Sequence, residues 1–162
     1  TYKERVIIPS FNSDCYCNYF IARAYGKEWP KYKNPPASRN IIFNELFLNR
    51  DEDVTLVEGA FDAIVAGNAI PLLGSTLRES SKLFQLLAEY EKTIYLALDK
   101  DVDKKTLSLV RMLQKHNKTV YKIDTSDIED IAAITKEEFF KRKSTALLMD
   151  SDNYLFYEVL NV

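Results

Sequence analysis

The feature that most constrains the fold is a regular alternation of strand-like and helix-like segments between residues 54 and 123. Short apolar runs suited to buried strands alternate with segments whose apolar residues recur every three or four positions, as on one face of a helix. We expect strands at 54–57, 69–73, 93–98 and 119–123, and helices at 61–66, 79–90 and 104–116. This order predicts an α/β fold with a mostly parallel four-stranded sheet flanked by helices.

The segments before and after this region follow other patterns. Two strand-like runs surround a turn-like Asn-Ser-Asp and predict a β-hairpin, and a loop rich in Pro, Lys and Asn follows it. The expected elements are strands at 5–10 and 16–23, a loop at 26–40, and helices at 42–48, 127–133, 135–142 and after 144. We therefore predict three parts: a basic hairpin and loop segment at 1–50, an α/β domain at 51–125, and a helical C-terminal extension at 126–162.

Charge is distributed unevenly along the chain, although the net charge is only −2. Residues 1–50 hold eight Lys and Arg against four Asp and Glu, whereas residues 51–162 hold 14 against 20. A basic segment beside an acidic one is typical of a metal site next to a phosphate-binding groove, and two solvated faces give the same pattern. No apolar run reaches the roughly 18 residues that a membrane span needs, so no membrane partner is expected.

Zinc and cysteine chemistry are disfavoured by the residue types present. Cys15 and Cys17 are expected at neighbouring positions on one strand face, where they form no disulfide and supply only half of a zinc site. The single histidine, His116, falls inside a predicted helix and is expected to be a surface or packing residue. A reduced, cytosolic setting fits this cysteine usage.

Acidic residues follow two of the predicted strands directly. Glu58 follows the strand at 54–57, and Asp99, Asp101 and Asp103 follow the strand at 93–98. Ligands of open α/β sheets bind beyond the carboxyl ends of the strands, and an acid there is costly unless it is paired or binds metal. Carboxylates in this arrangement suit magnesium or manganese. The alternative is that the three aspartates cap the helix that follows them.

Two of these segments resemble the motifs of the Toprim fold, which bacterial-type primases, type IA and type II topoisomerases and some nucleases share. The segments are Val-Glu-Gly-Ala-Phe-Asp-Ala at 57–63 and Leu-Asp-Lys-Asp-Val-Asp at 98–103. Upstream, Arg-Val-Ile-Ile-Pro at 5–9, Arg23 and Pro-Lys-Tyr-Lys-Asn-Pro-Pro at 30–36 resemble the run that leads into the Toprim part of bacterial and phage replicative primases. The turn at 74–76 and Asp-Ile-Glu-Asp at 127–130 resemble further segments of the same family. The chain therefore resembles the Toprim catalytic domain of bacterial-type or bacteriophage DNA primase.

The resemblance implies RNA primer synthesis on single-stranded DNA, with Mg²⁺ or Mn²⁺ as cofactor and ribonucleoside triphosphates as substrates. It also implies a replicative helicase as partner, a cytoplasmic setting in a bacterial or phage-infected cell, and a longer primase of which this chain is a fragment. The implied catalytic residues are Glu58, Asp99 and Asp101. The implied metal ligands are these three with Asp62, Asp103, Asp127 and Glu129, and the implied nucleotide or nucleic-acid contacts are Arg5, Arg23, Lys31, Tyr32 and Lys33.

Several alternatives stay open at this point. Asp62 is either a ligand or an acid at the start of a helix, and Asp127 and Glu129 are either ligands or helix caps. Tyr32 either stacks on a base or anchors its loop. For the whole chain, the alternatives are a Toprim nuclease with Glu58 as general base, or a non-catalytic module that binds single-stranded DNA or a partner.

Overall fold

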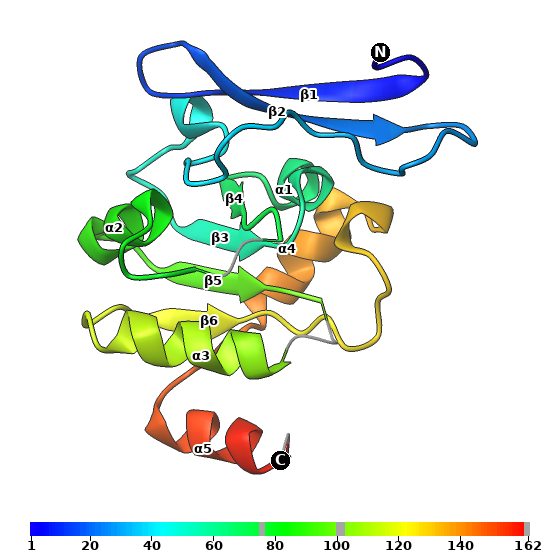
Figure 1. The fold of residues 1–162 in the computed structure, drawn as a ribbon. Helices are drawn as coiled ribbons and strands as arrows, with labels where there is room; N and C mark the ends of the chain where they lie inside the picture. Colours follow the sequence, from blue (N-terminus) through cyan, green and yellow to red (C-terminus); the bar gives the residue numbers. More distant parts are fainter. Residues whose placement is uncertain (75–76, 100–102, 161–162) are drawn as a thin grey trace. The chain divides into compact units, whose positions relative to one another are not determined.

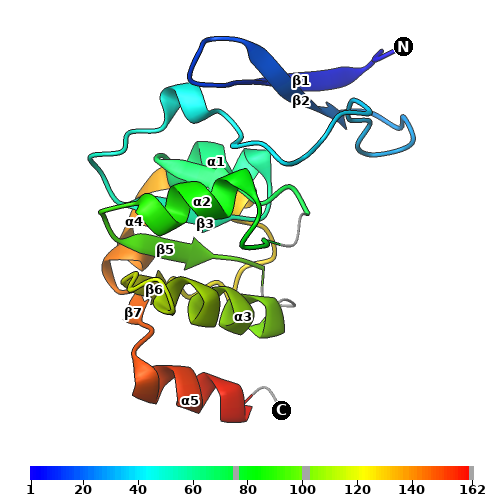
Figure 2. The same ribbon diagram turned by 60° about the vertical axis from the view of Figure 1, so that its left-hand side comes forward.

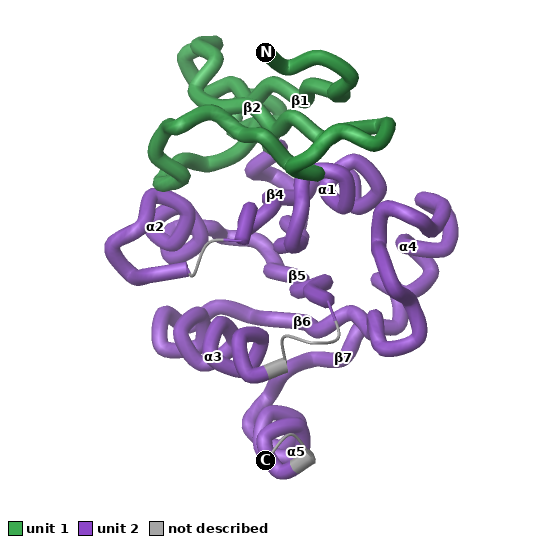
Figure 3. Tube along the Cα trace, turned by 45° about the vertical axis from the view of Figure 1, so that its right-hand side comes forward, with its two compact units in different colours: residues 1–48 green, residues 49–162 purple. Residues whose placement is uncertain are grey.

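The computed structural model describes residues 1–74, 77–99 and 103–160, without the side chains of Asp103 and Leu160. The chain divides into two compact units, residues 1–48 and residues 49–162 (Figure 3). The second unit includes the segment 126–162, predicted as a helical C-terminal extension.

The first unit is built on the predicted hairpin. Strands β1 (Arg5–Phe11) and β2 (Cys17–Ala24) pair antiparallel, with a shift of register between Ser10 and Phe11. Residues 31–33 then run back along β2: the Lys33 amide donates to the Ala22 carbonyl at 2.9 Å. The helix expected at 42–48 is a single 3-10 turn, η1 (Glu45–Phe47). Cys15 lies in the hairpin turn with a φ of 66°, so the prediction that it shares a strand face with Cys17 is wrong.

The second unit contains the predicted parallel sheet and one further strand. The strand order is β4 (Ala69–Pro71), β3 (Val54–Val57), β5 (Ile94–Ala97), β6 (Val120–Lys122) and β7 (Leu147–Leu148) (Figure 1, with β7 labelled in Figure 2). The first four strands are parallel, as predicted, whereas β7 pairs antiparallel with β6. The α/β fold class is confirmed.

Helices cover both faces of this sheet. The helices α2 (Lys82–Glu89) and α3 (Asp103–Gln114) lie on one face, and α1 (Ala60–Ala66) and α4 (Lys136–Ser144) lie on the other (Figures 2 and 3). The core under α1 and α4 includes Val57, Ala97, Ile123, Ile131 and Phe139. Every residue of β3 is buried, as expected of a central strand of a parallel sheet covered on both faces.

The C-terminal region departs from the prediction in two places. The helix expected at 127–133 is only the 3-10 turn η3 (Ile131–Ala133), because the Asp130 carboxylate accepts from the Ala132 amide at 2.9 Å and starts the turn there. The helix expected directly after residue 144 begins later, as α5 (Ser151–Leu160), because β7 intervenes. Within the ranges described above, no helix is long and apolar enough to cross a membrane.

Candidate metal centre

Two central strands of the sheet bring the predicted acids to the same end. Strands β3 and β5 are adjacent and parallel, with Val57 opposite Ala97, so Glu58 and Asp99 both emerge at their carboxyl ends. Asp99 is exposed. Asp101 lies outside the described residues; Asp103 begins α3, but its side chain is also outside them.

Glu58 is held by a lysine that sequence reasoning missed. The Nζ of Lys105 in α3 lies 3.1 and 3.2 Å from the two carboxylate oxygens of Glu58. Both side chains are partly buried, with exposed fractions of 27% for Lys105 and 19% for Glu58. The pair therefore joins the start of α3 to the end of β3.

Asp62 is buried one helical turn beyond Glu58. Gly59 caps α1, and its amide donates to Oδ2 of Asp62 at 2.8 Å. An acid in the first turn of a helix compensates the unpaired amides and the positive end of the helix dipole. Asp62 is nevertheless only 7% exposed, so its carboxylate is both a helix-start acid and a buried group. The structure shows the helix-start role of Asp62, and its role as a metal ligand stays a prediction.

Burial controls the ionisation of Asp62. Its pKa is raised from 3.8 to about 6, with desolvation as the largest cause and the Gly59 hydrogen bond opposing it. The charges of Asp130 and Asp99 and a side-chain hydrogen bond with Asp130 make up the rest of this increase. Asp130 is thus a second residue that the sequence prediction omitted, although it belongs to the segment 127–130 on which the resemblance drew. Asp62, Asp99 and Asp130 form one electrostatically connected group.

Asp127 and Glu129 are placed differently from Asp62. Nη1 and Nη2 of Arg142 in α4 contact the two oxygens of Asp127 at 2.6 and 2.9 Å, and this bidentate pair lowers the pKa of Asp127. Nε of Arg142 also donates to Glu138 at 2.8 Å. Glu129 is exposed. The structure connects the Asp127 carboxylate to α4, and its role as a metal ligand stays a prediction.

A buried hydroxyl fixes the loop after β6 to the end of β5. The hydroxyl of Thr125, which is 4% exposed, donates to the Leu98 carbonyl at 2.7 Å. Leu98 directly precedes Asp99, and Thr125 lies two residues before Asp127. This hydrogen bond sets the position of the two acidic segments relative to each other.

The donor set at this end of the sheet fits a hard divalent cation. Glu58, Asp62, Asp99 and Asp130 offer only carboxylate oxygens, the ligand type that Mg²⁺ prefers. The raised pKa of Asp62 reflects in part its negative neighbours, and a cation would relieve this repulsion. Over the described part of the chain, no three His, Cys, Asp or Glu residues are already arranged as a metal cage. The residues fit the ion in chemistry, and Lys105 supplies the positive charge beside Glu58 in this structure.

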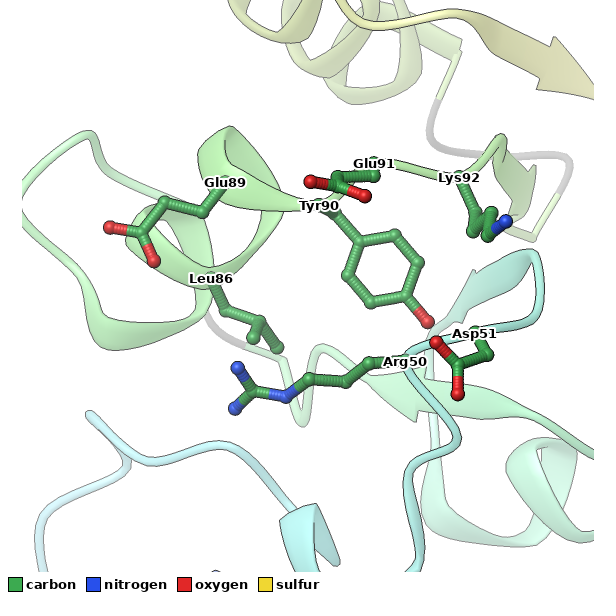
Figure 4. Close-up of a pocket in the computed structure, with 7 residues that line it drawn as sticks. All are labelled: Arg50, Asp51, Leu86, Glu89, Tyr90, Glu91 and Lys92. Carbon is green, nitrogen blue, oxygen red and sulfur yellow. The ribbon is translucent and has the colours of Figure 1, made fainter.

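Two pockets lie at the opposite end of the strands, away from these acids. One has a volume of about 260 Å³ and is lined by Arg50, Asp51, Leu86, Glu89, Tyr90, Glu91 and Lys92 (Figure 4). The Tyr90 hydroxyl oxygen lies 2.9 Å from the carbonyl oxygens of both Asn49 and Glu52, which share its one proton as acceptors. The Tyr90 contacts hold the segment before β3 in place, which is a structural role. The second pocket, of about 460 Å³, lies near Asp53 and Lys143.

The predicted nucleic-acid contacts lie in the first unit. Nη1 of Arg5 donates to the Lys31 carbonyl at 3.3 Å, and Nζ of Lys33 donates to the Thr1 carbonyl at 3.1 Å. The Tyr32 ring lies near two cations: the guanidinium carbon of Arg23 is 5.9 Å from its centroid and Nζ of Lys31 is 6.0 Å away. The structure therefore gathers the five residues around β2 and the strand-like segment 31–33.

Comparison with known proteins finds similarity to DNA primases in both sequence and fold. No family model matches the chain. A DNA primase from Thermotoga maritima is 28% identical over 114 residues, which cover 62% of this chain and 20% of that protein.

Solved structures extend the similarity over nearly the whole chain. A DnaG primase catalytic domain bound to single-stranded DNA matches with a TM-score of 0.78 and 18% identity, over 98% of this chain and 56% of that one. The zinc-binding and RNA polymerase domains of Aquifex aeolicus primase match with a TM-score of 0.72 and 23% identity, over 91% of this chain and 41% of that one. This chain therefore has the Toprim-like fold of the DnaG catalytic core, as the sequence resemblance implied, and it spans about a fifth of the curated relative.

Proposed function

We propose that this chain carries the nucleotidyl-transfer site of a DNA primase, which makes short RNA primers on single-stranded DNA. One observation carries the proposal: Glu58 and Asp99 emerge from adjacent parallel strands beside the buried Asp62, in a chain whose fold is that of the DnaG catalytic core over 98% of its length. The sequence similarity to a bacterial DNA primase supports the same conclusion.

In the proposed reaction, the 3′-hydroxyl oxygen of a primer attacks the α-phosphate of a ribonucleoside triphosphate. A phosphodiester bond forms, the bond to pyrophosphate breaks so that pyrophosphate leaves, and the hydroxyl proton passes to solvent water. Negative charge develops on the attacking and leaving oxygens, and Mg²⁺ held by Glu58, Asp99 and Asp101, with Asp62 beside them, would stabilise this charge. Asp103, Asp127 and Glu129 are proposed as outer ligands that act through water.

The chain's own side chains have distinct tasks in this proposal. Lys105 neutralises Glu58 and keeps the carboxylate at the end of β3, where both oxygens accept from Nζ. The bidentate Arg142–Asp127 pair and the Thr125–Leu98 hydrogen bond hold the acidic segments in position. Such positioning matters because an alignment error of about 1 Å costs on the order of a hundredfold in rate.

The basic residues of the first unit would bind the template. We propose that Arg23, Lys31 and Lys33 contact phosphates, while Arg5 braces the segment that carries Lys31. Phosphate contacts of this kind position a nucleic acid without reading its sequence. A replicative helicase is the partner that the resemblance implies.

The test supplies the chain with a single-stranded template, labelled ribonucleotides and Mg²⁺ or Mn²⁺. Short oligoribonucleotides are expected with the wild type and not with Asp99→Ala. Lys115→Ala, a change directly after the C-terminal end of α3, serves as the control that leaves synthesis intact. Template degradation that depends on Asp99 would instead identify a nuclease.

A second measurement separates metal binding from turnover, because the chain spans only part of its relatives. Calorimetry with Mn²⁺ is expected to give binding that weakens at least tenfold in a Glu58→Gln, Asp99→Asn double variant. Metal binding that this double variant leaves unchanged would refute the assignment of the metal centre.

A further inference from the structure

We propose that Trp29 stacks on a base of single-stranded DNA and is the principal base-contacting side chain of the first unit. The inference deepens the proposed function and rests on it, because it assigns a residue to the template that the primase would read. Neither the sequence motifs nor the resemblance singled out Trp29.

The loop that carries Trp29 has a firmly held base. The Ala24 amide donates to the Lys31 carbonyl at 2.8 Å, the Lys33 amide donates to the Ala22 carbonyl at 2.9 Å, and Arg23 and Tyr32 form an antiparallel bridge. Residues 25–30 connect these two paired segments and are all exposed. The loop is therefore presented to solvent from a rigid support, as binding residues commonly are.

Trp29 is exposed to an unusual degree. It is 85% exposed, more than any other exposed large hydrophobic side chain of the described residues. Tryptophan is on average highly buried, and its large ring gains more from contact than most side chains. Tryptophan is also enriched at interfaces, where its ring contacts a partner. The exposure of Trp29 on a held loop therefore points to a contact with a partner.

The charged residues around the loop indicate what kind of partner it binds. Between residues 22 and 34 there are four cations, Arg23, Lys27, Lys31 and Lys33, and one acid, Glu28. An aromatic ring within a cationic surface fits a polyanion that also offers flat faces for stacking. Nucleic acid has both properties, and base faces are accessible where the strand is single rather than paired.

Trp29 is better suited to stacking than Tyr32. The Tyr32 ring is 44% exposed and has the cationic groups of Arg23 and Lys31 within about 6 Å of its centroid. Those two cations compete with a base for the faces of the tyrosine ring. We therefore assign Tyr32 to anchoring the segment 31–33, and we assign base stacking to Trp29.

The sequence provides a direct probe, because Trp29 is the only tryptophan of the chain. Intrinsic fluorescence of the whole chain is measured during titration with an unlabelled single-stranded DNA oligonucleotide. Anisotropy of a labelled oligonucleotide is measured in parallel to give binding independently. We expect the tryptophan fluorescence to be quenched at the same concentrations at which the anisotropy rises.

Variants then measure the contribution of the ring. Stacking of one base on an aromatic side chain corresponds to an affinity change of about 5- to 150-fold, so Trp29→Ala is expected to weaken binding by a factor in this range. Trp29→Phe, which keeps an aromatic face, is expected to recover most of it. The matched control is Tyr16→Ala, because Tyr16 is a 73%-exposed aromatic residue in the turn before β2, whereas the Trp29 loop follows β2. This control is expected to bind as the wild type does.

The outcomes distinguish this inference from the function on which it rests. If the oligonucleotide binds by anisotropy but Trp29 is not quenched and Trp29→Ala binds equally well, the stacking inference is refuted and template binding stands. If no oligonucleotide binds at all, both fail. Equal quenching by duplex DNA, or quenching by anionic lipid vesicles without quenching by DNA, would also overturn the assignment to a single strand.

Discussion

Replacement of Asp62 by asparagine is expected to stabilise the metal-free protein at neutral pH and to have little effect in acid. Asp62 is 7% exposed and its pKa is raised from 3.8 to about 6, first by desolvation and then by Asp130 and Asp99. One pKa unit corresponds to about 1.4 kcal/mol, so the raised pKa of Asp62 corresponds to a destabilisation of the folded protein of at most about 3 kcal/mol. Screening by solvent reduces this destabilisation to roughly 1–2 kcal/mol. An asparagine keeps an oxygen that can accept from the Gly59 amide.

The direction with pH follows from proton linkage. Below about pH 4 Asp62 is protonated in both the folded and the unfolded chain, so its burial carries no ionisation cost. Between about pH 4 and pH 6 the unfolded chain loses the proton first, and the folded protein is progressively destabilised as the pH rises. Above this range the full cost is present. Asp62→Asn removes this dependence.

The assay is chemical denaturation followed by circular dichroism, in EDTA, at pH 4.5 and pH 7.5. The variant is expected to gain roughly 1–2 kcal/mol over the wild type at pH 7.5 and much less at pH 4.5. Asp124→Asn is the matched control of opposite sign, because hydrogen bonds from Ser126 lower the pKa of Asp124, so the variant loses stability at neutral pH. An equal difference between Asp62→Asn and wild type at both pH values would refute the reasoning about buried charge.

Two further predictions concern the contacts around the candidate centre. Lys105→Met is expected to raise the affinity for Mn²⁺ by up to about fivefold in calorimetry. The reason is that both oxygens of Glu58 are freed from an ion pair worth at most about 1 kcal/mol. Weaker Mn²⁺ binding by the variant would show that Lys105 supports the metal site. Thr125→Val is expected to lower the free energy of unfolding by about 1–2 kcal/mol in a urea titration, because it leaves the Leu98 carbonyl without its 2.7 Å hydrogen bond; an unchanged midpoint would contradict this.

The central strands were predictable because each carries its own pattern. All four residues of β3 are buried, and the short apolar run at 54–57 predicts its bounds correctly. Helix ends were harder to place: the helix expected at 79–90 begins only at Lys82, because the Ser81 side chain accepts from the Phe84 amide and caps it there. Strand β7 could not be predicted, since its two residues are defined by pairing with β6 rather than by burial of their own.

The partners of the site acids were missed for a different reason. Lys105 contacts Glu58 across 47 residues of sequence, and nothing in the local pattern of α3 distinguishes Lys105 from Lys104. Its position becomes clear only when α3 packs beside the end of β3. Arg142 pairs with Asp127 from α4 in the same way, 15 residues away. The sequence motifs predict where the acids lie, whereas tertiary packing determines which basic side chains pair with them.

The state of charge of the acids is also a property of the fold rather than of the motif. Asp62 and Asp127 are the same residue type in two matched motifs, yet burial raises the pKa of Asp62 to about 6 and the Arg142 guanidinium lowers that of Asp127. An acid that already has a bidentate cation gains less from Mg²⁺ than one that is buried among other acids. We therefore expect the cation to be held directly by the acids that follow β3 and β5, while Asp127 positions its loop and acts on the cation only through water. Two aspartates that the sequence assigns to one metal set thus take different roles, because the fold buries Asp62 and pairs the exposed Asp127 with Arg142.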